Sequence, residues 1–406
     1  MILEDKLSID YDLGSSLITV QKLIPIKNVG IEDLIIERGN TSGMWDNTLE
    51  YNYAAKCWIL GVESFLTYKH HVNIHNSTFI EIRGCYFHQA SNYGNGGTGY
   101  GVMLENHTTN CLVEDNLFTT LRHSIIVQTG ANRNVFGYNH SWIREWETWT
   151  ATPDIGTADI SIHANYPYAN LFEGNLVELI WADDDHGANG PYNTFVRNQV
   201  ELGIILSSAD YSNAVGNDAG VNVSPSFPYN FFFGSSEQVL DVAATNVLNG
   251  GSIEHSLYYF TPGNQINYLC KDFSYYLDDF PPYFLQYPNV SWPPLGAAVA
   301  TFEDLSTGWP GGTIPAYERR ITGGKLTLDG APLPYTNNIT FQNYFIGVGN
   351  MGNINVSGTV YTSPTNNFSV NQGTTIEGTA LNQTLQTETL LLLVQQVIQG
   401  IPIKYN

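Results

Sequence analysis

The stretch Asn134-Val-Phe-Gly-Tyr-Asn139 decides the fold, because its pattern of apolar residues, two variable residues and a final asparagine returns along the chain. Clear copies are Cys111-Leu-Val-Glu-Asp-Asn116, Asn170-Leu-Phe-Glu-Gly-Asn175 and Asn193-Thr-Phe-Val-Arg-Asn198. A weaker copy ends at Asn217, and an earlier one, Ile80-Glu-Ile-Arg-Gly-Cys85, has cysteine as its last residue. The last residues of these six copies follow one another at steps of 31, 23, 36, 23 and 19 residues.

These steps predict a parallel β-helix, an all-β solenoid in which a coil of three short strands takes about 20 residues and the two long steps carry insertions. Three residues before each last residue stands an apolar one, which predicts an inward-facing column: Ile82, Val113, Phe136, Phe172, Phe195 and Ala214. The asparagines are expected at the corners in left-handed backbone geometry, with each amide bonded to the amide of the next coil. Propeller blades of about 40 residues do not fit the steps.

Three regions are expected from the way the pattern fades. Residues 1–255 form the β-helix, residues 256–330 form an aromatic and proline-rich segment that packs back or closes the end, and residues 331–406 form a small β-rich appendage. We expect Thr384–Ile398 to be a short amphipathic helix, and the appendage is a candidate for attachment to a cell surface. Met1 is not followed by a signal-peptide pattern, so export is inferred from composition and resemblance.

Composition restricts the partners. The 38 Asp and Glu residues against 16 Lys and Arg residues give a net charge of −22, which repels nucleic acid. It also repels an acidic polysaccharide unless a cation such as Ca²⁺ lies between them. Few lysines among many Asn, Gly and Thr residues are typical of exported proteins. The apolar run Leu390–Val394 is too short to span a membrane. The four cysteines form no zinc or redox motif and are expected to be buried small side chains.

A candidate site follows from the same register. Seven residues beyond the final positions stand His123, Trp146, Ala182 and Ile205, which we expect to stack along one edge of successive coils. Acids, bases and aromatic rings then converge on this ridge, which is the combination that a sugar site needs.

The ridge supplies residues for three roles. The catalytic candidates are His123, Arg122, Asp184, His186 and Glu145. The substrate-binding candidates are Tyr100 from a Gly-rich loop, Trp142, Trp146, Trp149 and Trp181. The candidate ligands for Ca²⁺ are Asp183 and Asp185. Structural alternatives stay open for each group: the tryptophans can pack under the insertion, the aspartates can form a solvated turn, and His123 can be a hydrogen-bonded corner residue.

Several stretches resemble exported bacterial proteins of the pectate-lyase-like β-helix superfamily over residues 20–320. They are Gly99-Tyr-Gly-Val, Leu121-Arg-His-Ser, Gln128-Thr-Gly-Ala, Asn134-Val-Phe-Gly-Tyr-Asn139 and His186-Gly-Ala-Asn-Gly-Pro-Tyr-Asn-Thr. The resemblance implies a right-handed β-helix and polysaccharide as the partner. The chain lacks the spaced polygalacturonase signatures, and the arginine base and Ca²⁺ carboxylates of pectate lyases have no residue-by-residue counterparts, so no catalytic residue is carried over.

Two classes of function remain. The first is an extracellular enzyme that cleaves a polysaccharide, either as a Ca²⁺-dependent lyase or as a glycoside hydrolase. The second is a non-catalytic secreted or cell-surface protein: an adhesin, a carbohydrate-binding module or a building block of a fibre. They differ in whether the ridge groups form a site with perturbed acidity or lie flat and solvated.

Overall fold

Successive repeats place their strands side by side in three lines. The computed structural model describes residues 17–38, 47–94, 96–145, 157–163, 165–209, 212–219, 229–233, 247–248, 252–255, 274–277, 279–287, 290–296, 312–322, 325–328, 339–341, 354–356 and 391–397. One repeat, for example, contains β12 (Leu112–Glu114), β13 (Leu117–Leu121) and β14 (His123–Val127), one for each line.

The first line is a 9-stranded sheet within the described part of the chain, and all its pairs are parallel. Its strands are β2 (Ile26–Lys27), β3 (Gly30–Glu32), β6 (Ala54–Leu60), β9 (Thr78–Arg83), β12, β15 (Val135–Gly137), β18 (Leu171–Glu173), β20 (Thr194–Val196) and β22 (Asn213–Val215).

The second and third lines join into a 16-stranded parallel sheet because β19 (Leu176–Asp183) pairs with both. The second line is β4 (Ile35–Glu37), β7 (Glu63–Thr67), β10 (Tyr86–Ala90), β13 and β16 (His140–Arg144). The third is β5 (Leu49–Asn52), β8 (His70–His75), β11 (Tyr100–Glu105), β14 and β17 (Ile160–His163). Beyond β19 follow β21 (Gln199–Leu206), β23 (Asp218–Ala219), β24 (Tyr229–Phe233), β25 (Val247–Leu248) and β26 (Ser252–His255).

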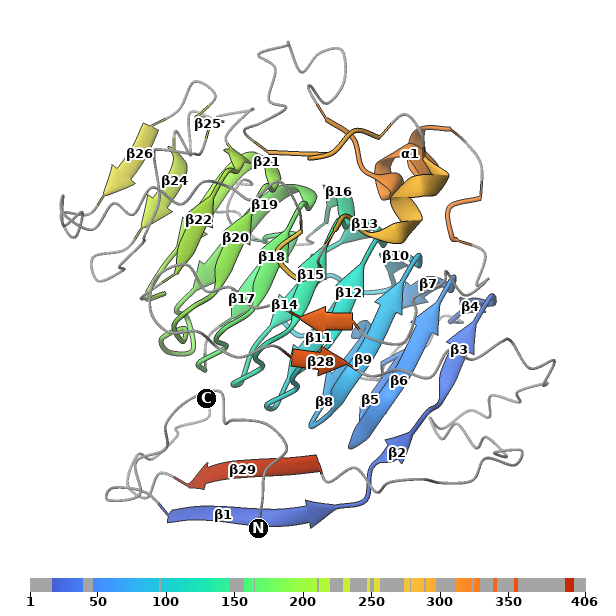
Figure 1. The fold of residues 1–406 in the computed structure, drawn as a ribbon, viewed down its shortest axis with the longest axis vertical. Helices are drawn as coiled ribbons and strands as arrows, with labels where there is room; N and C mark the ends of the chain where they lie inside the picture. Colours follow the sequence, from blue (N-terminus) through green and yellow to red (C-terminus); the bar gives the residue numbers. More distant parts are fainter. Residues whose placement is uncertain are drawn as a thin grey trace.

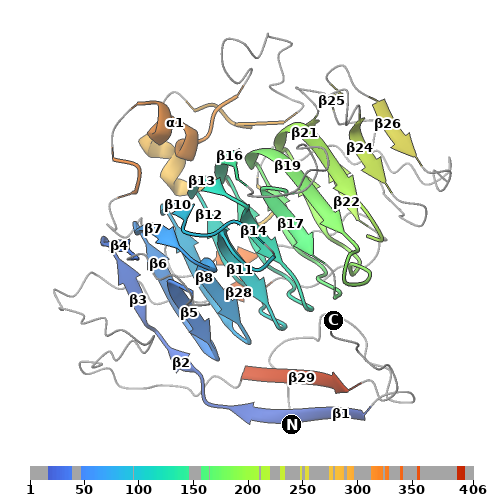
Figure 2. The same ribbon diagram turned by 180° about the vertical axis from the view of Figure 1, so that it is seen from behind.

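The protein is mostly β, and its long parallel sheets curl into a half-barrel (Figures 1 and 2). The predicted apolar column is confirmed: each of its residues is the register partner of the next, and all are fully buried. Phe136 and Phe172 stack with ring centroids 4.9 Å apart, and Phe195 follows at 5.0 Å. The same hydrophobic cluster contains side chains from all three lines, so the sheets share one core.

The asparagine ladder is also confirmed. The amide of Asn139 donates to Asn175 Oδ1 at 3.0 Å, and the amide of Asn116 donates to Asn139 Oδ1 at 3.0 Å. A second ladder runs through Asn134, Asn170 and Asn193. The expected left-handed geometry at the asparagine itself is wrong. The residue before it takes that conformation, at Asp115, Tyr138, Gly174, Arg197 and Gly216, because the side-chain ladder needs the asparagine on an ordinary backbone.

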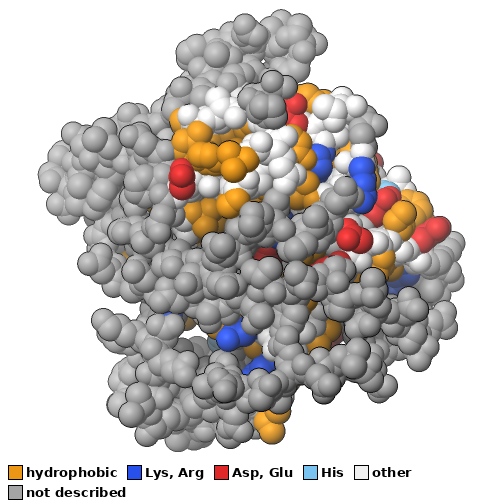
Figure 3. Space-filling view, turned by 45° about the vertical axis from the view of Figure 1, so that its right-hand side comes forward, with side chains coloured by type: hydrophobic (Ala, Val, Ile, Leu, Met, Phe, Trp, Pro, Cys, Tyr) orange, Lys and Arg blue, Asp and Glu red, His pale blue; other side chains and the backbone are white. Residues whose placement is uncertain are grey.

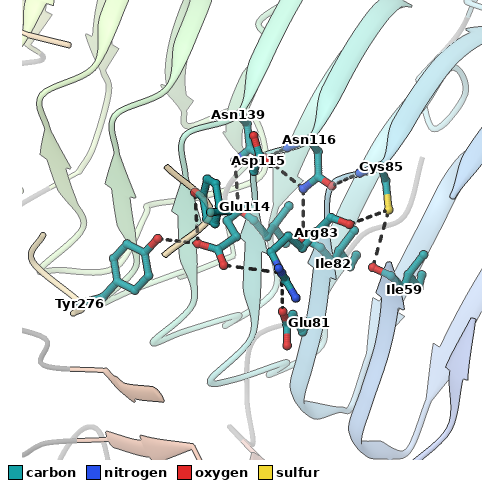
Figure 4. Close-up of polar contacts among 12 residues, drawn as sticks. Ile59, Glu81, Ile82, Arg83, Cys85, Glu114, Asp115, Asn116, Asn139 and Tyr276 are labelled. Atoms are coloured by element: carbon teal, nitrogen blue, oxygen red, sulfur yellow. Dashed lines mark hydrogen bonds and ion pairs between the residues drawn. The ribbon is translucent and has the colours of Figure 1, made fainter. Parts of the chain in front are cut away.

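Residues from the aromatic segment pack on the outer face of the 9-stranded sheet. Tyr276 and Tyr283 share a buried cluster with Leu112 and Val135. Tyr283 belongs to the 3-10 helix η1 (Pro282–Gln286), and the helix α1 (Pro315–Ile321) contributes Ala316 to the same cluster. The hydroxyl of Tyr276 donates to Glu114 Oε2 at 2.6 Å (Figure 4). On the face that Figure 3 draws, hydrophobic side chains gather with acidic and basic side chains beside them.

Buried ion pairs hold this segment as well. Arg319 of α1 donates to Asp115 Oδ2 at 2.7 Å, and both side chains are buried. Glu173 accepts from Arg197 at 2.6 Å and from the backbone N–H of Tyr275 at 2.9 Å. These carboxylates point away from the core and are neutralised by partners that come from the segment or the neighbouring strand.

The last residues contradict one expectation. Leu391–Val397 is strand β29, which pairs antiparallel with β1 (Leu17–Leu23), and no amphipathic helix lies in this described stretch. A two-stranded antiparallel sheet joins β27 (Ile339–Phe341) and β28 (Ile354–Val356). The predicted region boundaries near residues 256 and 331 lie outside the described residues.

Two smaller expectations concern cysteines and membranes. Cys57, Cys85 and Cys111 are buried and unpaired, as expected, whereas Cys270 lies outside the described residues. No helix in the described part of the chain is long and apolar enough to cross a membrane.

Candidate functional site

A row of polar side chains crosses the outer face of the third line of strands. Leu104, Val127, Ile162 and Ala182 are register partners and point into the core. Because side chains alternate along a strand, the following residues point outward: Glu105, Gln128, His163 and Asp183. Strands lie about 4.8 Å apart, so the row places its chemical groups at regular intervals.

His163 and Asp183 form the central pair of this row. His163 Nδ1 lies 2.7 Å from Asp183 Oδ2, and the Asp183 side chain is almost fully buried. Asp183 Oδ1 also accepts the backbone N–H of Asp185 at 3.2 Å. A carboxylate on Nδ1 fixes the imidazole tautomer and leaves Nε2 as the proton acceptor. His163 is 23% exposed, so a substrate can reach it.

His186 lies against this pair. Its ring centroid is 4.6 Å from that of His163, with the two rings perpendicular, and its side chain is exposed. Two imidazoles in ring contact face a substrate from the same side, where one can accept a proton and the other can donate one.

His123 is a buried neutral neighbour of the pair. Its Nδ1 lies 2.7 Å from the carbonyl oxygen of Ala158 and therefore carries the proton. Burial, followed by the charge of Arg122, lowers the pKa of His123 to about 3, and the charges of His163 and Asp183 also act on it. His123 is therefore held neutral at neutral pH, with its proton on Nδ1.

Tyr100 and Arg122 border the site under the Gly-rich loop. The Tyr100 ring lies 4.9 Å from that of His123, and its hydroxyl accepts the backbone N–H of Gly97 at 2.8 Å. Burial raises the pKa of Tyr100, while Arg122 lowers it and Asp183 raises it. The backbone N–H of Arg122 donates to the carbonyl of Gly99 at 2.8 Å. The loop is thus tied to two of the predicted residues.

Asp184 and Asp185 follow Asp183 in an exposed turn. Both are exposed, and Asp184 accepts a hydrogen bond of 2.9 Å from Ser208 Oγ. In the part of the chain that the structure describes, no group of three or more His, Cys, Asp or Glu residues is arranged to hold a metal ion. The binding of Ca²⁺ by Asp183 and Asp185 stays a prediction.

The tryptophans predicted to bind substrate do not lie together. Trp181 is half-buried against Ala158 and Ile205, two residues before Asp183. Trp142 lies elsewhere: its ring is 5.0 Å from His140 and 4.4 Å from the Arg320 guanidinium of α1. Trp146 and Trp149 lie outside the described residues. Glu145 is half-buried after β16, where its backbone N–H bonds to the carbonyl of Leu121.

The expected stacking of the ridge differs from the observed register. Ile125 pairs with Ile160, which pairs with Ile180. Two residues earlier in the same register, the neighbour of His123 on the next coil is therefore Ala158 and not Trp146. Ala182 pairs with Leu206 instead of Ile205, because β19 and β21 shift register at a bulge between Val177 and Leu179.

The sequence repeat does not identify His163, because β17 follows the insertion after Trp149 and carries no copy of the repeated pattern that would align it with its neighbours. A usable signal was present: the alternation Ile160-Ser-Ile-His163 matches Ile125-Ile-Val-Gln128 residue for residue. Comparison of the chain with models of protein families, with curated proteins and with solved structures found no match.

Proposed function

We propose that the chain is an exported right-handed parallel β-helix of the pectate-lyase-like kind that binds and cleaves a polysaccharide on the outer face of its third line of strands. The three parallel lines of strands, the shared core and the asparagine ladders support this architecture. The proposal includes export and attachment to a cell surface through residues 331–406. These two parts are supported by composition and resemblance alone.

The observation that carries the proposal is the 2.7 Å bond between His163 Nδ1 and Asp183 Oδ2 on an accessible face. Asp183 orients His163 and fixes its tautomer, as a carboxylate does for a histidine base. Trp181, two residues before Asp183, is half-buried and offers aromatic surface, which suits the apolar face of a sugar ring. Tyr100 is buried and supports the site from below.

In the hydrolytic form, protonated His186 gives its proton to the leaving oxygen as the bond from that oxygen to the anomeric carbon breaks. A water molecule then enters from the same side, and its oxygen bonds to the anomeric carbon as His163 Nε2 takes the proton that it loses. In the lyase form, His163 takes the C5 proton of a uronate. The electron pair forms the C4–C5 double bond, and the oxygen on C4 leaves with a proton from His186. Both forms use the same two imidazoles, so the products decide between them.

The test is a screen of neutral, uronate-containing and amine-bearing polysaccharides, with Ca²⁺ added and with Ca²⁺ chelated. New reducing ends report any cleavage, and the ultraviolet absorbance of unsaturated uronates reports the lyase form. His163→Ala and Asp183→Asn are expected to lose at least about a hundredfold in rate, as removal of a positioned base does. His88→Ala, which removes from β10 of the second line an imidazole paired with the carboxylate of Glu63, is the matched control and is expected to keep its activity.

Each result bears on the proposal. Cleavage that survives His163→Ala would place the chemistry elsewhere. Binding of a polysaccharide without cleavage of any would overturn the enzyme and favour the adhesin or carbohydrate-binding alternative.

A further inference from the structure

Glu105 is the acidic residue two strands before His163 in the polar row. Its Oε1 accepts from the amide of Asn73 at 3.1 Å, and its Oε2 accepts from the amide of Gln128 at 3.0 Å. Two amides, one on β8 and one directly after β14, therefore fix the carboxylate in place. A carboxylate held in this way is already oriented before any ligand arrives.

The charge of Glu105 is not balanced by the residues around it. No Lys, Arg or His in the described part of the chain forms an ion pair with it, and the nearest imidazole of the row, His75, is paired with Glu50 at 2.7 Å. The side chain is half-buried, so its charge is screened less than that of a fully solvated group.

Asn73 makes this orientation rigid. The residue is 5% exposed, and its buried amide donates to Glu105 from below the surface of the row. The carboxylate of Glu105 is therefore the group that can meet a ligand, and it suits one that donates hydrogen bonds and carries positive charge.

We propose that this row binds an amine-bearing polysaccharide, with Glu105 forming an ion pair with the ammonium group of one sugar. The inference rests on the proposed function, since it names the substrate class of the same site. Glu105 lies about 10 Å along the row from His163, so the amine belongs to a sugar beside the one at which the bond breaks. The net charge of −22 favours the same class, because it attracts a cationic polymer and repels a uronate polymer.

The experiment measures binding of the full chain to β-linked glucosamine oligomers, to the same oligomers with every amine acetylated, and to polygalacturonate. We expect the glucosamine oligomers to bind most tightly and to lose affinity as salt is raised. Glu105→Gln keeps the size of the side chain but has one acceptor oxygen, so one of the two neighbouring amides must turn its own oxygen towards the new NH2 group. The variant is expected to bind the glucosamine oligomers about tenfold more weakly, with no change for the acetylated oligomers. Glu37→Gln, which removes an exposed carboxylate from β4, is the control for net charge and is expected to bind as the unaltered chain does.

The comparison of free and acetylated amines needs no variant, so the inference stays testable if Glu105→Gln does not fold. Equal binding of the two oligomers, or preference for polygalacturonate, would overturn it. Cleavage of a neutral polymer that depends on His163 without any preference for amines would leave the proposed function standing and reject only this inference. Amine-dependent binding through Glu105 with no cleavage would support the inference and reject the enzyme.

Discussion

The carboxylate of Asp159 accepts the backbone N–H of Leu179 at 2.9 Å, at the point where β19 leaves β16 and joins β17. The same oxygen accepts the backbone N–H of Glu178, and the other oxygen accepts Ser141 Oγ at 2.6 Å. Backbone groups at a bulge lose their strand partner, and Asp159 supplies the missing acceptor. Since β17 begins at the next residue, Asp159 also sets the register that brings His163 to Asp183.

Replacing Asp159 by alanine is expected to destabilise the fold by about 3 kcal/mol, because it leaves two backbone donors and a hydroxyl buried without an acceptor. Urea unfolding measures the loss. Asp184→Ala is the matched control: its carboxylate is exposed, so we expect a change within about 0.5 kcal/mol. Similar unfolding midpoints for the two variants would contradict the role assigned to Asp159.

The same carboxylate predicts a pH dependence. Burial, and next the charge of Glu178, raise the pKa of Asp159 from 3.8 to about 6, although Arg144 lies 3.8 Å away and lowers it. The folded state then holds the proton more tightly than the unfolded state. Its contribution to stability is complete below about pH 4 and is lost as pH rises through 6.

Asp159→Asn removes this titration. The unfolding free energy of the unaltered chain, relative to that of the variant, is therefore expected to fall between pH 4 and 6 by at most about 1.4 kcal/mol per pH unit. Denaturant titrations of both proteins across this range measure the difference. Parallel curves would show that Asp159 titrates with an ordinary pKa.

Much of the fold was predictable because the same contact between neighbouring coils recurs in every copy of the repeat. Phe136, Phe172 and Phe195 stand at the same offset from Asn139, Asn175 and Asn198, so each copy supports the others. The candidate site occurs once. Locating His163 required the register after an insertion and a bulge, neither of which a repeated pattern reveals.

Trp142 shows a second limit. Its neighbouring acids and tryptophans in the sequence suggested a sugar site, yet Arg320 lies over its ring and also contacts His140, which is 180 positions away in the chain. No local pattern reports a partner that distant. Tyr276 on Glu114 is a contact of the same kind, between residues 162 positions apart.

The central asparagine of the ladder gives a third prediction. Asn139 donates to Asn175 Oδ1 and to the carbonyl of Val113, and it accepts from Asn116. An aspartate cannot donate these bonds and would bury a charge against two carbonyl oxygens. Asn139→Asp is therefore expected to lower the free energy of unfolding by about 3 kcal/mol or more, the loss typical of an unpaired buried charge.

Thermal and urea unfolding test this expectation, with Asn165→Asp as the control. Asn165 is exposed and in left-handed geometry, which aspartate also tolerates, so this variant is expected to unfold as the unaltered chain does. If the two variants unfold alike, the ladder contributes little to stability.

The last prediction concerns the buried ion pair between Arg319 of α1 and Asp115, which follows β12 of the 9-stranded sheet. Removing one member of such a pair leaves the other charge unpaired, so Arg319→Met is expected to cost about 3–5 kcal/mol. Burial raises the pKa of Asp115 to about 6 even though Arg319 lowers it, so losing the arginine raises that pKa further. The folded variant then holds a proton more tightly, and its deficit in stability is expected to grow as pH rises from 5 to 8.

The double variant Asp115→Asn with Arg319→Met separates charge from packing. Neutralising the orphaned carboxylate should recover most of the loss and remove its pH dependence, because a neutral pair of similar volume avoids the cost of desolvating a charge. Urea unfolding of the two single variants and the double variant completes the cycle. A double variant as unstable as the sum of the single ones would mean that Arg319 acts through its contact with the carbonyl of Leu326 and not through the carboxylate of Asp115.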